Sequence, residues 1–384
     1  MSRDVTLYCL TPPLQGTAVV DVDQLNQGAR RYHRSTRRIG GYWAGGFEMS
    51  PGKTLPLSYL AQWFENRIGF GFQDRLGGAI TWAGLVWEVE LAIDGAKERR
   101  SYQGIYNATK VHYTDADGEN QTTSWYTNAA SIAQYGRREL IITLDAVSAT
   151  VAQTKAQDEL VKTAVPFPQT IALGRSVRSE GLTVTTAGLV FTANNRYVTA
   201  GDGSEGNVSA YIQEIIEDDC DFLKVGRIQT NTLQVVKGFD GPIRAWDALV
   251  ELTELGDGTN PYIIYVDADG YCHYHQASNT PLYEWRGASG GGLTTRLGGR
   301  SPWSLWPGVV RNLKRPSSTP APGTFLADGR DTWVAEISMA DGQDEPELKP
   351  DGFDPADIER AVERNKRWLE QAAEEAAAAA EGAA

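Results

Sequence analysis

Residues 104–168 read GIYNATKVHYTDADGENQTTSWYTNAASIAQYGRRELIITLDAVSATVAQTKAQDELVKTAVPFP, and the order of elements in this stretch decides the fold. The pattern predicts a strand over 106–113, a turn at Asp115-Ala-Asp-Gly118 and a second strand over 140–144. A helix follows and ends at Pro166, because proline cannot continue a helix. Its buried stripe has helical spacing: Ala152, Ala156 and Leu160. No residue here points to catalysis.

The composition is that of a soluble globular protein rich in strands. The chain has 384 residues, of which 41% are hydrophobic and 22% charged, and this length predicts roughly two to three domains. Forty glycines, 16 tyrosines and 11 tryptophans favour strands and turns. The net charge of −13 is uneven, since residues 341–384 hold 13 acidic and 5 basic side chains, a net of −8. This balance argues against general nucleic-acid binding.

Cysteine usage and the apolar segments indicate folding in a reducing cytoplasm. Cys9, Cys220 and Cys272 are widely spaced and odd in number, which argues against a disulfide framework or a zinc knuckle. The opening residues lack the basic and apolar regions of a signal peptide. No apolar run approaches the roughly 20 residues that a membrane-spanning helix needs. We therefore expect no stable membrane insertion.

The first hundred residues read mostly as strands. In residues 85–91, Leu85, Trp87, Val89 and Leu91 share one face and Glu88 and Glu90 lie on the other, as the period of a strand requires. We expect a break at Trp82-Ala-Gly84 between this strand and the preceding one, over 78–82. A helix is predicted over 57–67 from apolar residues at 57, 60, 63 and 64, and a kinked strand over 37–49.

The second half alternates strands with helices, which predicts an α+β chain. Short strands are expected over 182–185 and 188–192, and Asn207 is a good N-cap for a helix that runs to Phe222. A second helix is predicted to open at Gly241-Pro242, with proline at its first position. A strand over 233–236 lies between these helices, and a hairpin pairs 262–266 with 271–275. Asp354 caps a predicted terminal helix that fades into an alanine run.

Several local patterns resemble ligand sites, but their chemistry is incomplete. Gly201-Asp-Gly-Ser-Glu-Gly206 matches a dinucleotide fingerprint, yet its two acidic residues would repel a pyrophosphate. In the strand containing Cys272, His273 and His275, only the two histidines share a face, so a metal site would need a distant carboxylate to complete it, and we interpret these as ordinary strand residues. Asp-Ala-Asp-Gly occurs at 115–118 and 267–270, hinting at an internal duplication, but neither copy places a glutamate at the twelfth calcium-loop position.

Two further groups are candidate contact residues. One is the basic cluster Arg30, Arg31, Arg34, Arg37 and Arg38, with His33, which could meet an acidic partner, solvent or a channel that DNA crosses. The other is a set of tryptophans in a Gly/Ser/Pro-rich run, suited to packing or to stacking on sugars: Trp285, Trp303 and Trp306. We find no hydrolase, zinc-protease or P-loop motif, and no local pattern singles out a carboxylate pair. The sequence predicts no catalytic, cofactor or metal site.

The chain resembles the hub proteins at the tip of bacteriophage tails. The resemblance rests first on the "S-x-x-x-Y-G-x-R-E" pattern in Ser131–Glu139, which leads into an Ala/Leu helix ending at proline. Trp82–Glu88 resembles the early "W-x-G-x-V/I-x-E" strand, Tyr106-Asn107 a returning strand, and Gly308–Asn312 a late strand of that family. With the helices after Asn207 and Pro242, the resemblance covers about residues 35–335.

The resemblance implies two β-barrel-like, tail-tube-type domains with smaller α/β insert modules. The expected divisions are 1–105 (first barrel-like part), 106–170 (insert), 171–260 (second α+β module), 261–340 (second barrel-like part) and 341–384 (acidic linker and C-terminal helix). It also implies a homotrimeric ring at the virion tail tip, assembled in the host cytoplasm. The implied partners are a tail tube or distal tail protein, a tape measure protein and tip or fibre proteins, with transient passage of DNA.

Two other functions stay open from sequence. A receptor- or glycan-binding tail module would use the tryptophan-rich run between 283 and 307. A peptidoglycan-cleaving tail enzyme would need a carboxylate pair that sequence alone does not identify. Contractile and non-contractile tails, or a phage and a domesticated tail-like particle, are not separated by these patterns.

Overall fold

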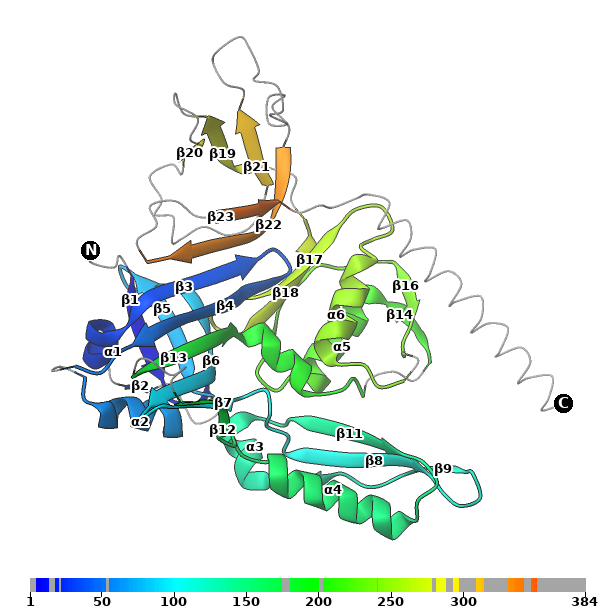
Figure 1. Ribbon diagram of the computed structural model, residues 1–384. Helices are drawn as coiled ribbons and strands as arrows, with labels where there is room; N and C mark the ends of the chain where they lie inside the picture. Colours follow the sequence, from blue (N-terminus) through cyan, green and yellow to red (C-terminus); the bar gives the residue numbers. More distant parts are fainter. Residues whose placement is uncertain are drawn as a thin grey trace.

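The computed structural model shows a mixed α+β protein built around a strongly curled sheet (Figure 1). It describes residues 5–13, 18–20, 22–52, 55–174, 180–199, 203–239, 241–277, 281–287, 293–296, 309–313, 331–341 and 347–350. The expected α+β class is thereby confirmed. The five expected domain divisions stay predictions, and the predicted alanine-rich terminal helix lies outside the described residues.

The curled sheet combines the first hundred residues with strands that return from much later in the chain. The neighbouring strands of the curl pair antiparallel, and β4 also makes a short parallel pairing at Gly40 and Gly41 with Tyr265 and Val266 of the second module. In spatial order its strands are β2 (Val19–Val20), β1 (Thr6–Leu10), β5 (Gly71–Leu76), β6 (Ala79–Ile93), β13 (Gly181–Gly188), β4 (Gly40–Met49), β3 (Arg30–Arg37), β22 (Asp331–Ala340) and β23 (Glu347–Pro350). Helices α1 (Val22–Gly28) and α2 (Leu57–Asn66) lie beside this sheet (Figure 1).

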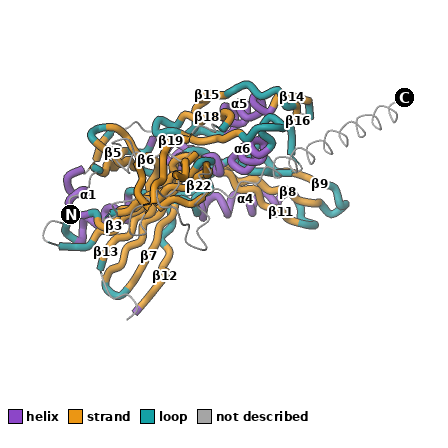
Figure 2. The backbone as a smooth tube through the Cα atoms, turned by 90° about the horizontal axis from the view of Figure 1, so that it is seen from above, coloured by secondary structure: helices purple, strands orange, loops and turns teal. Residues whose placement is uncertain are grey.

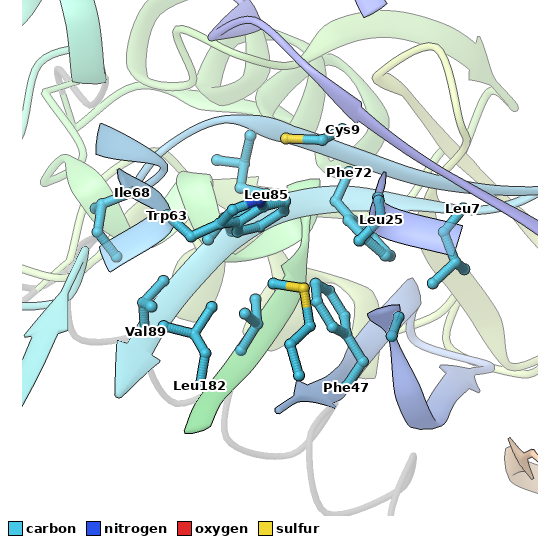
Figure 3. Close-up of a cluster of buried hydrophobic side chains, with 14 of the residues drawn as sticks. Leu7, Cys9, Leu25, Phe47, Trp63, Ile68, Phe72, Leu85, Val89 and Leu182 are labelled. Carbon is cyan, nitrogen blue, oxygen red and sulfur yellow. The ribbon is translucent and has the colours of Figure 1, made fainter. Parts of the chain in front are cut away.

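An aromatic core fills the inside of the curl. Phe47, Trp63 and Phe72 are buried together (Figure 3), and Trp82 belongs to the same core. The Phe47 and Phe72 rings stack with centroids 5.4 Å apart. Helix α2 contributes Leu60, Trp63 and Phe64 to this core, which confirms the helix predicted over 57–67. Met339 of β22 joins the same core, so the sheet is completed by residues near position 340.

The expected break at Trp82-Ala-Gly84 is wrong, because β6 runs unbroken through these residues. Gly84 pairs with Gly188 of β13, and a Cβ added at Gly84 would lie 2.2 Å from the carbonyl oxygen of Ala187. The glycine therefore permits a close approach of two strands and does not end one. The predicted kinked strand over 37–49 is also divided differently, since β3 ends at Arg37 and β4 begins at Gly40.

An insert module occupies residues 106–164, between β7 (Ala96–Ser101) and β12 (Gln169–Leu173), two antiparallel strands of a projecting arm (Figure 2). Its strand β8 (Ala108–Thr114) pairs in parallel with β11 (Glu139–Leu144), and helix α4 (Ala149–Thr163) packs on this sheet. The remaining elements are β9 (Asn120–Thr122), β10 (Tyr126–Thr127) and α3 (Ala129–Tyr135). Ala152 and Ala156 are buried as predicted, whereas Leu160 is half-buried.

The second module packs two helices against a short sheet. Its core joins residues of η3 (Leu189–Asn195), α5 (Val208–Asp219), α6 (Ala245–Glu254), β17 (Tyr262–Val266) and β18 (Tyr271–Gln276). The strand β15 (Lys224–Ile228) runs parallel to β18, and β14 (Glu205–Asn207) pairs with β16 (Gln234–Val236). The predicted hairpin of β17 and β18 is confirmed.

Two predicted boundaries in this module are wrong. Residues 188–192 form mostly 3-10 helix, because the chain turns where Gly188 crosses β4, with Tyr42 O only 1.8 Å from a Cβ built on that glycine. The second helix begins at Ala245, since Ile243 O accepts a hydrogen bond from Val198 N and Arg244 forms a β-bridge with Tyr197.

The remaining strands extend the sheet beyond β22. They are β19 (Pro281–Gly287), β20 (Leu293–Arg296) and β21 (Val309–Leu313), and β21 pairs with both β19 and β22. The strand β21 agrees with the late strand expected over 308–312. Among the helices that the structure describes, none is long and apolar enough to cross a membrane.

Candidate functional site

The segment Ser131–Glu139 begins with a helix that is fixed from behind. Asn128 caps α3 by accepting a hydrogen bond from Ser131 N at 3.0 Å, and the Ser131 hydroxyl donates to the carbonyl of Ala164. Fully buried Asn107 donates to Ser131 Oγ at 3.1 Å and to Gly136 O at 2.7 Å. These bonds connect the start of β8, helix α3 and the end of α4.

The Tyr-Gly pair of this segment makes close contacts with both neighbouring cores. Tyr135 O accepts a hydrogen bond from the buried Tyr102 hydroxyl at 2.5 Å. Gly136 has φ of 73°, and a Cβ there would lie 2.2 Å from the ring of Phe222 in the second module. Both the backbone conformation and the contact require glycine.

Arg138 is a buried cation held by neutral groups. Its Nε donates to Ile105 O at 2.7 Å, its terminal nitrogen donates to Asn195, and its guanidinium lies 4.2 Å from the ring centre of Tyr102. Burial disfavours the charged form of both groups, so it lowers the pKa of the Arg138 guanidinium and raises the pKa of the Tyr102 hydroxyl. The side chain thereby joins the first sheet, the insert and η3.

Glu139 completes the segment with a network of ions. Its carboxylate is 2% exposed, lies 2.6 Å from Arg137 Nε and accepts a hydrogen bond from Tyr197 N at 3.0 Å. Arg196 lies 3.9 Å from the same carboxylate and 2.9 Å from Asp221. Arg244 donates to Glu139 O at 3.0 Å. We call the contacts of Asn107, Ser131, Gly136, Arg138 and Glu139 the junction, because they hold the insert against the two neighbouring cores.

The partners of the junction could not be identified from sequence. Asn195 and Arg244 lie 57 and 105 positions from the residues that they contact, and no motif marks them. The buried pair of Arg34 and Asp74, 2.8 Å apart, was also missed. A signal existed at Asn107 alone, because it lies within the "Y-N" pattern at the start of β8.

The structure divides the basic cluster between two environments. Arg34 and Arg38 are buried, and Arg34 also donates to Thr81 O at 2.9 Å. Arg30 and Arg31 are exposed, and Arg31 pairs with Glu48 at 3.1 Å. Arg37 lies 3.1 Å from Glu336 and 4.1 Å from the ring centre of Trp43. Any interface or channel role therefore falls on Arg30, Arg31 and Arg37.

The side chain of His273, in β18, makes its hydrogen bonds within the chain. His273 Nε2 lies 3.0 Å from Asp267 Oδ2, while its Nδ1 accepts a hydrogen bond from Arg227 N. Cys272 faces the buried side, where burial raises the pKa of its thiol. In the part of the chain that the structure describes, no three His, Cys, Asp or Glu side chains gather closely enough to hold a metal ion.

The two Asp-Ala-Asp-Gly turns have the same geometry. Asp115 Oδ1 accepts from the backbone of 117 and 119, and Asp267 Oδ1 accepts from that of 269 and 271. Gly118 and Gly270 have φ of 83° and 82°. The strands that flank the two hairpins differ, however. In the hairpin at 115–118, β11 pairs in parallel with the first strand, β8. In the hairpin at 267–270, β15 pairs in parallel with the second strand, β18. The turn recurs, but the topology around it does not.

The structure describes only some of the residues of the glycine-rich and tryptophan-rich candidate sites. Gly206 lies in the β14–β16 ribbon, which is antiparallel, while Gly201 and Asp202 lie outside the described residues. Asn207 is the N-cap residue of α5, but its side chain accepts a hydrogen bond from Gln234 and does not cap the helix. Trp285 lies in β19, and Trp303 and Trp306 fall outside the described residues. Their contact role stays a prediction.

No family model matches the chain, and no curated protein matches it. Solved structures similar to this one include the tail protein from Neisseria meningitidis MC58, with 10% sequence identity, a TM-score of 0.41, and coverage of 92% of this chain and 98% of that chain. Another is the prophage MuSo2 43 kDa tail protein from Shewanella oneidensis, with 8% identity, a TM-score of 0.41, and coverage of 93% and 100%.

Proposed function

We propose that this chain is a non-enzymatic structural protein of a bacteriophage tail or tail-like particle, and that it forms the hub at the tail tip. Three copies make a ring that joins the tail tube or distal tail ring to the tip proteins. The ring leaves a passage for DNA during genome ejection.

The junction is the observation that carries this proposal. Ser131–Glu139, the segment with the strongest family resemblance, is a set of internal contacts that fixes three parts of the molecule to one another. Its charged groups are directed at partners within the chain, as the contacts of Arg138 and Glu139 show. A ring subunit needs this property, because its separate surfaces must keep a constant orientation toward several partners.

We assign the partners by their position relative to the ring. The tail tube or distal tail protein contacts one side, and the tape measure protein and the tip or fibre proteins contact the other. The exposed cations Arg30 and Arg31 and the half-buried Arg37, all on β3, are the residues that we assign to the DNA passage or to an acidic partner. Such contacts would be electrostatic and would weaken with salt.

Cryo-electron microscopy of intact particles tests the proposal. We expect three copies of the chain around the tail axis, directly below the tube. A position away from the axis, or a single copy at a fibre tip, would contradict the hub. Glycan-array binding that is lost in Trp303→Ala would instead support a receptor-binding module, and lysis of cell-wall preparations would support an enzyme.

A further inference from the structure

A cleft opens between the curled sheet and the second module. Its volume is about 470 Å³, within the usual range of small-molecule sites. Strands β1, β5 and β6 form its floor, and the segment 221–224 and the turn at 267–270 form its wall. Gly71 and Gln73 alternate with the core residue Phe72, so the floor is the sheet face turned away from the aromatic core. The cleft is therefore separate from the interior of the curl.

The floor of the cleft is apolar. Leu10 lies opposite Gly71 in the pair of β1 and β5, and a Cβ built on that glycine would lie 3.1 Å from Leu10 Cβ. Glycine therefore leaves room above the strand. Val19, which also lines the cleft, is 50% exposed. Further apolar lining residues are Ala83, Leu189 and Phe222. A ligand with an apolar body would remove these groups from water, which is favourable.

Two cations without a carboxylate partner line the cleft, one from the sheet and one from the second module. Arg75 donates from two of its nitrogens to Gln73, at 3.2 and 2.8 Å, and its guanidinium lies 4.5 Å from the ring centre of Tyr8. Lys224 is exposed, with its Nζ 5.2 Å from the ring centre of Tyr271. Within the described residues, neither cation forms an ion pair.

The two carboxylates of the cleft differ from each other. The charge of Asp221 is compensated inside the chain, because its Oδ1 lies 2.9 Å from Arg196 and its Oδ2 accepts a hydrogen bond from Arg137 N at 3.0 Å. Asp269 is exposed on the turn. Among the described side chains that line the cleft, two cations and one carboxylate thus remain without an ion partner. The balance favours an anionic ligand.

We propose that the cleft binds a small amphiphilic carboxylate of the fatty-acid type, with its apolar body on Leu10, Val19 and Phe222 and its carboxylate between Arg75 and Lys224. Guanidinium and ammonium groups both hold carboxylates through charge-assisted hydrogen bonds. The site does not depend on the proposed hub, which is tested by the position of the chain in the particle.

The bound ligand would also stabilise the arrangement of the modules. Its carboxylate and apolar body contact both the curled sheet and the second module, and the ring of Phe222 lies against Gly136 of the junction. A ligand that binds only the folded chain stabilises it by mass action. Decanoate should therefore raise the thermal unfolding temperature in a concentration-dependent manner.

Calorimetric titration of the full chain with decanoate, below its micelle concentration, tests the site. We expect decanoate to bind roughly tenfold more tightly than neutral 1-decanol, and Arg75→Gln or Lys224→Gln to weaken decanoate binding by roughly tenfold. Arg227→Gln is the matched control, because Arg227 is an exposed cation on the same strand as Lys224 and does not line the cleft. Asp269→Asn should strengthen binding, since it removes the opposing charge.

A series of shorter carboxylates tests the apolar floor separately. Each methylene removed from decanoate should weaken binding by up to about fourfold. Thermal unfolding without ligand confirms that each variant is folded. Equal affinity for decanoate and 1-decanol, an equal loss in Arg227→Gln and Arg75→Gln, or no dependence on chain length would each overturn the site.

Discussion

The first core contains Phe47, Trp63, Phe72 and Trp82, whereas the buried apolar cluster beneath α4 of the insert module consists of the small residues Val111, Ala152 and Ala156. Apolar burial of about 1.5–3 kcal/mol for each large side chain stabilises the first core. The insert is too small to depend on burial alone. It depends on the polar contacts of the junction, so two regions of one chain are stabilised by different physics.

The largest effect should follow from truncating the first core. Trp82→Ala removes a fully buried indole that also donates to Ser35 O at 3.1 Å. We expect a loss of about 3–5 kcal/mol in the free energy of unfolding, measured by urea denaturation. If Trp82→Ala lowered the free energy of unfolding by less than a substitution in the insert module does, the contrast between the two regions would be contradicted.

The buried ion pair is the place where the first core also depends on charge. Arg34→Met leaves Asp74 buried without its cation, although Tyr32 and Thr81 still donate to it, and we expect a loss of about 3 kcal/mol. Arg31→Met is the matched control on the same strand, since its pair with Glu48 is exposed and contributes about 0–1 kcal/mol. Equal losses in the free energy of unfolding of the two variants would show that the buried pair stabilises the fold no more than the exposed pair does.

Arg138→Met tests the junction directly. It removes the donor from Ile105 O and Asn195, which we expect to cost about 1–3 kcal/mol. Hydrogen exchange should show lost protection first in residues 106–164, while the first core keeps its protection. Lys162→Met, an exposed change in the same module, serves as the control. Simultaneous loss of protection in both regions would refute the separate stabilisation of the insert.

The smallest effect concerns the surface of α4. A hydrogen bond from Lys155 at 2.7 Å is the main cause that lowers the pKa of Glu159, with Lys162 adding to it. This contribution is present above the unfolded pKa of about 4.3 and is lost as the pH falls through the lower folded value. Glu159→Gln should cost about 0.3–0.5 kcal/mol at neutral pH and nothing in acid. Thermal unfolding at two pH values measures the difference.

The elements with clear periodicity were predictable, and the contacts between modules were not. The alternation of buried Val89 and Leu91 with half-buried Glu90 reflects burial on one face, which sequence records locally. The spacing of Leu60, Trp63 and Phe64 does the same for the helix α2. Gly84 was misread as a break because its tightly packed neighbour, Ala187, lies a hundred positions away. The start of α6 was misplaced for the same reason, since a bridge to Tyr197 holds Arg244 extended.

The candidate site shows the same limit more sharply. The sequence grouped five arginines because they are near one another in the chain, but β-strand geometry and distant partners separate them, and Asp74 draws Arg34 into the interior. The motif in Ser131–Glu139 identified the right segment, while its partners Asn195 and Arg244 are visible only in three dimensions. Long-range polar contacts follow the topology, and a single sequence does not record them.

During synthesis, β3 is made long before β22, the strand that pairs with its outer edge. Its partner β22 is paired through residues such as Glu336 and Ala340, and Asp341 accepts a hydrogen bond from Tyr32 N. A ribosome adding about 5–20 residues per second needs on the order of 15–60 s to synthesise the chain between β3 and β22. Through this time β3 is an open edge, and its positive charges at Arg30, Arg31 and Arg37 would repel the same strand of nascent chains on neighbouring ribosomes.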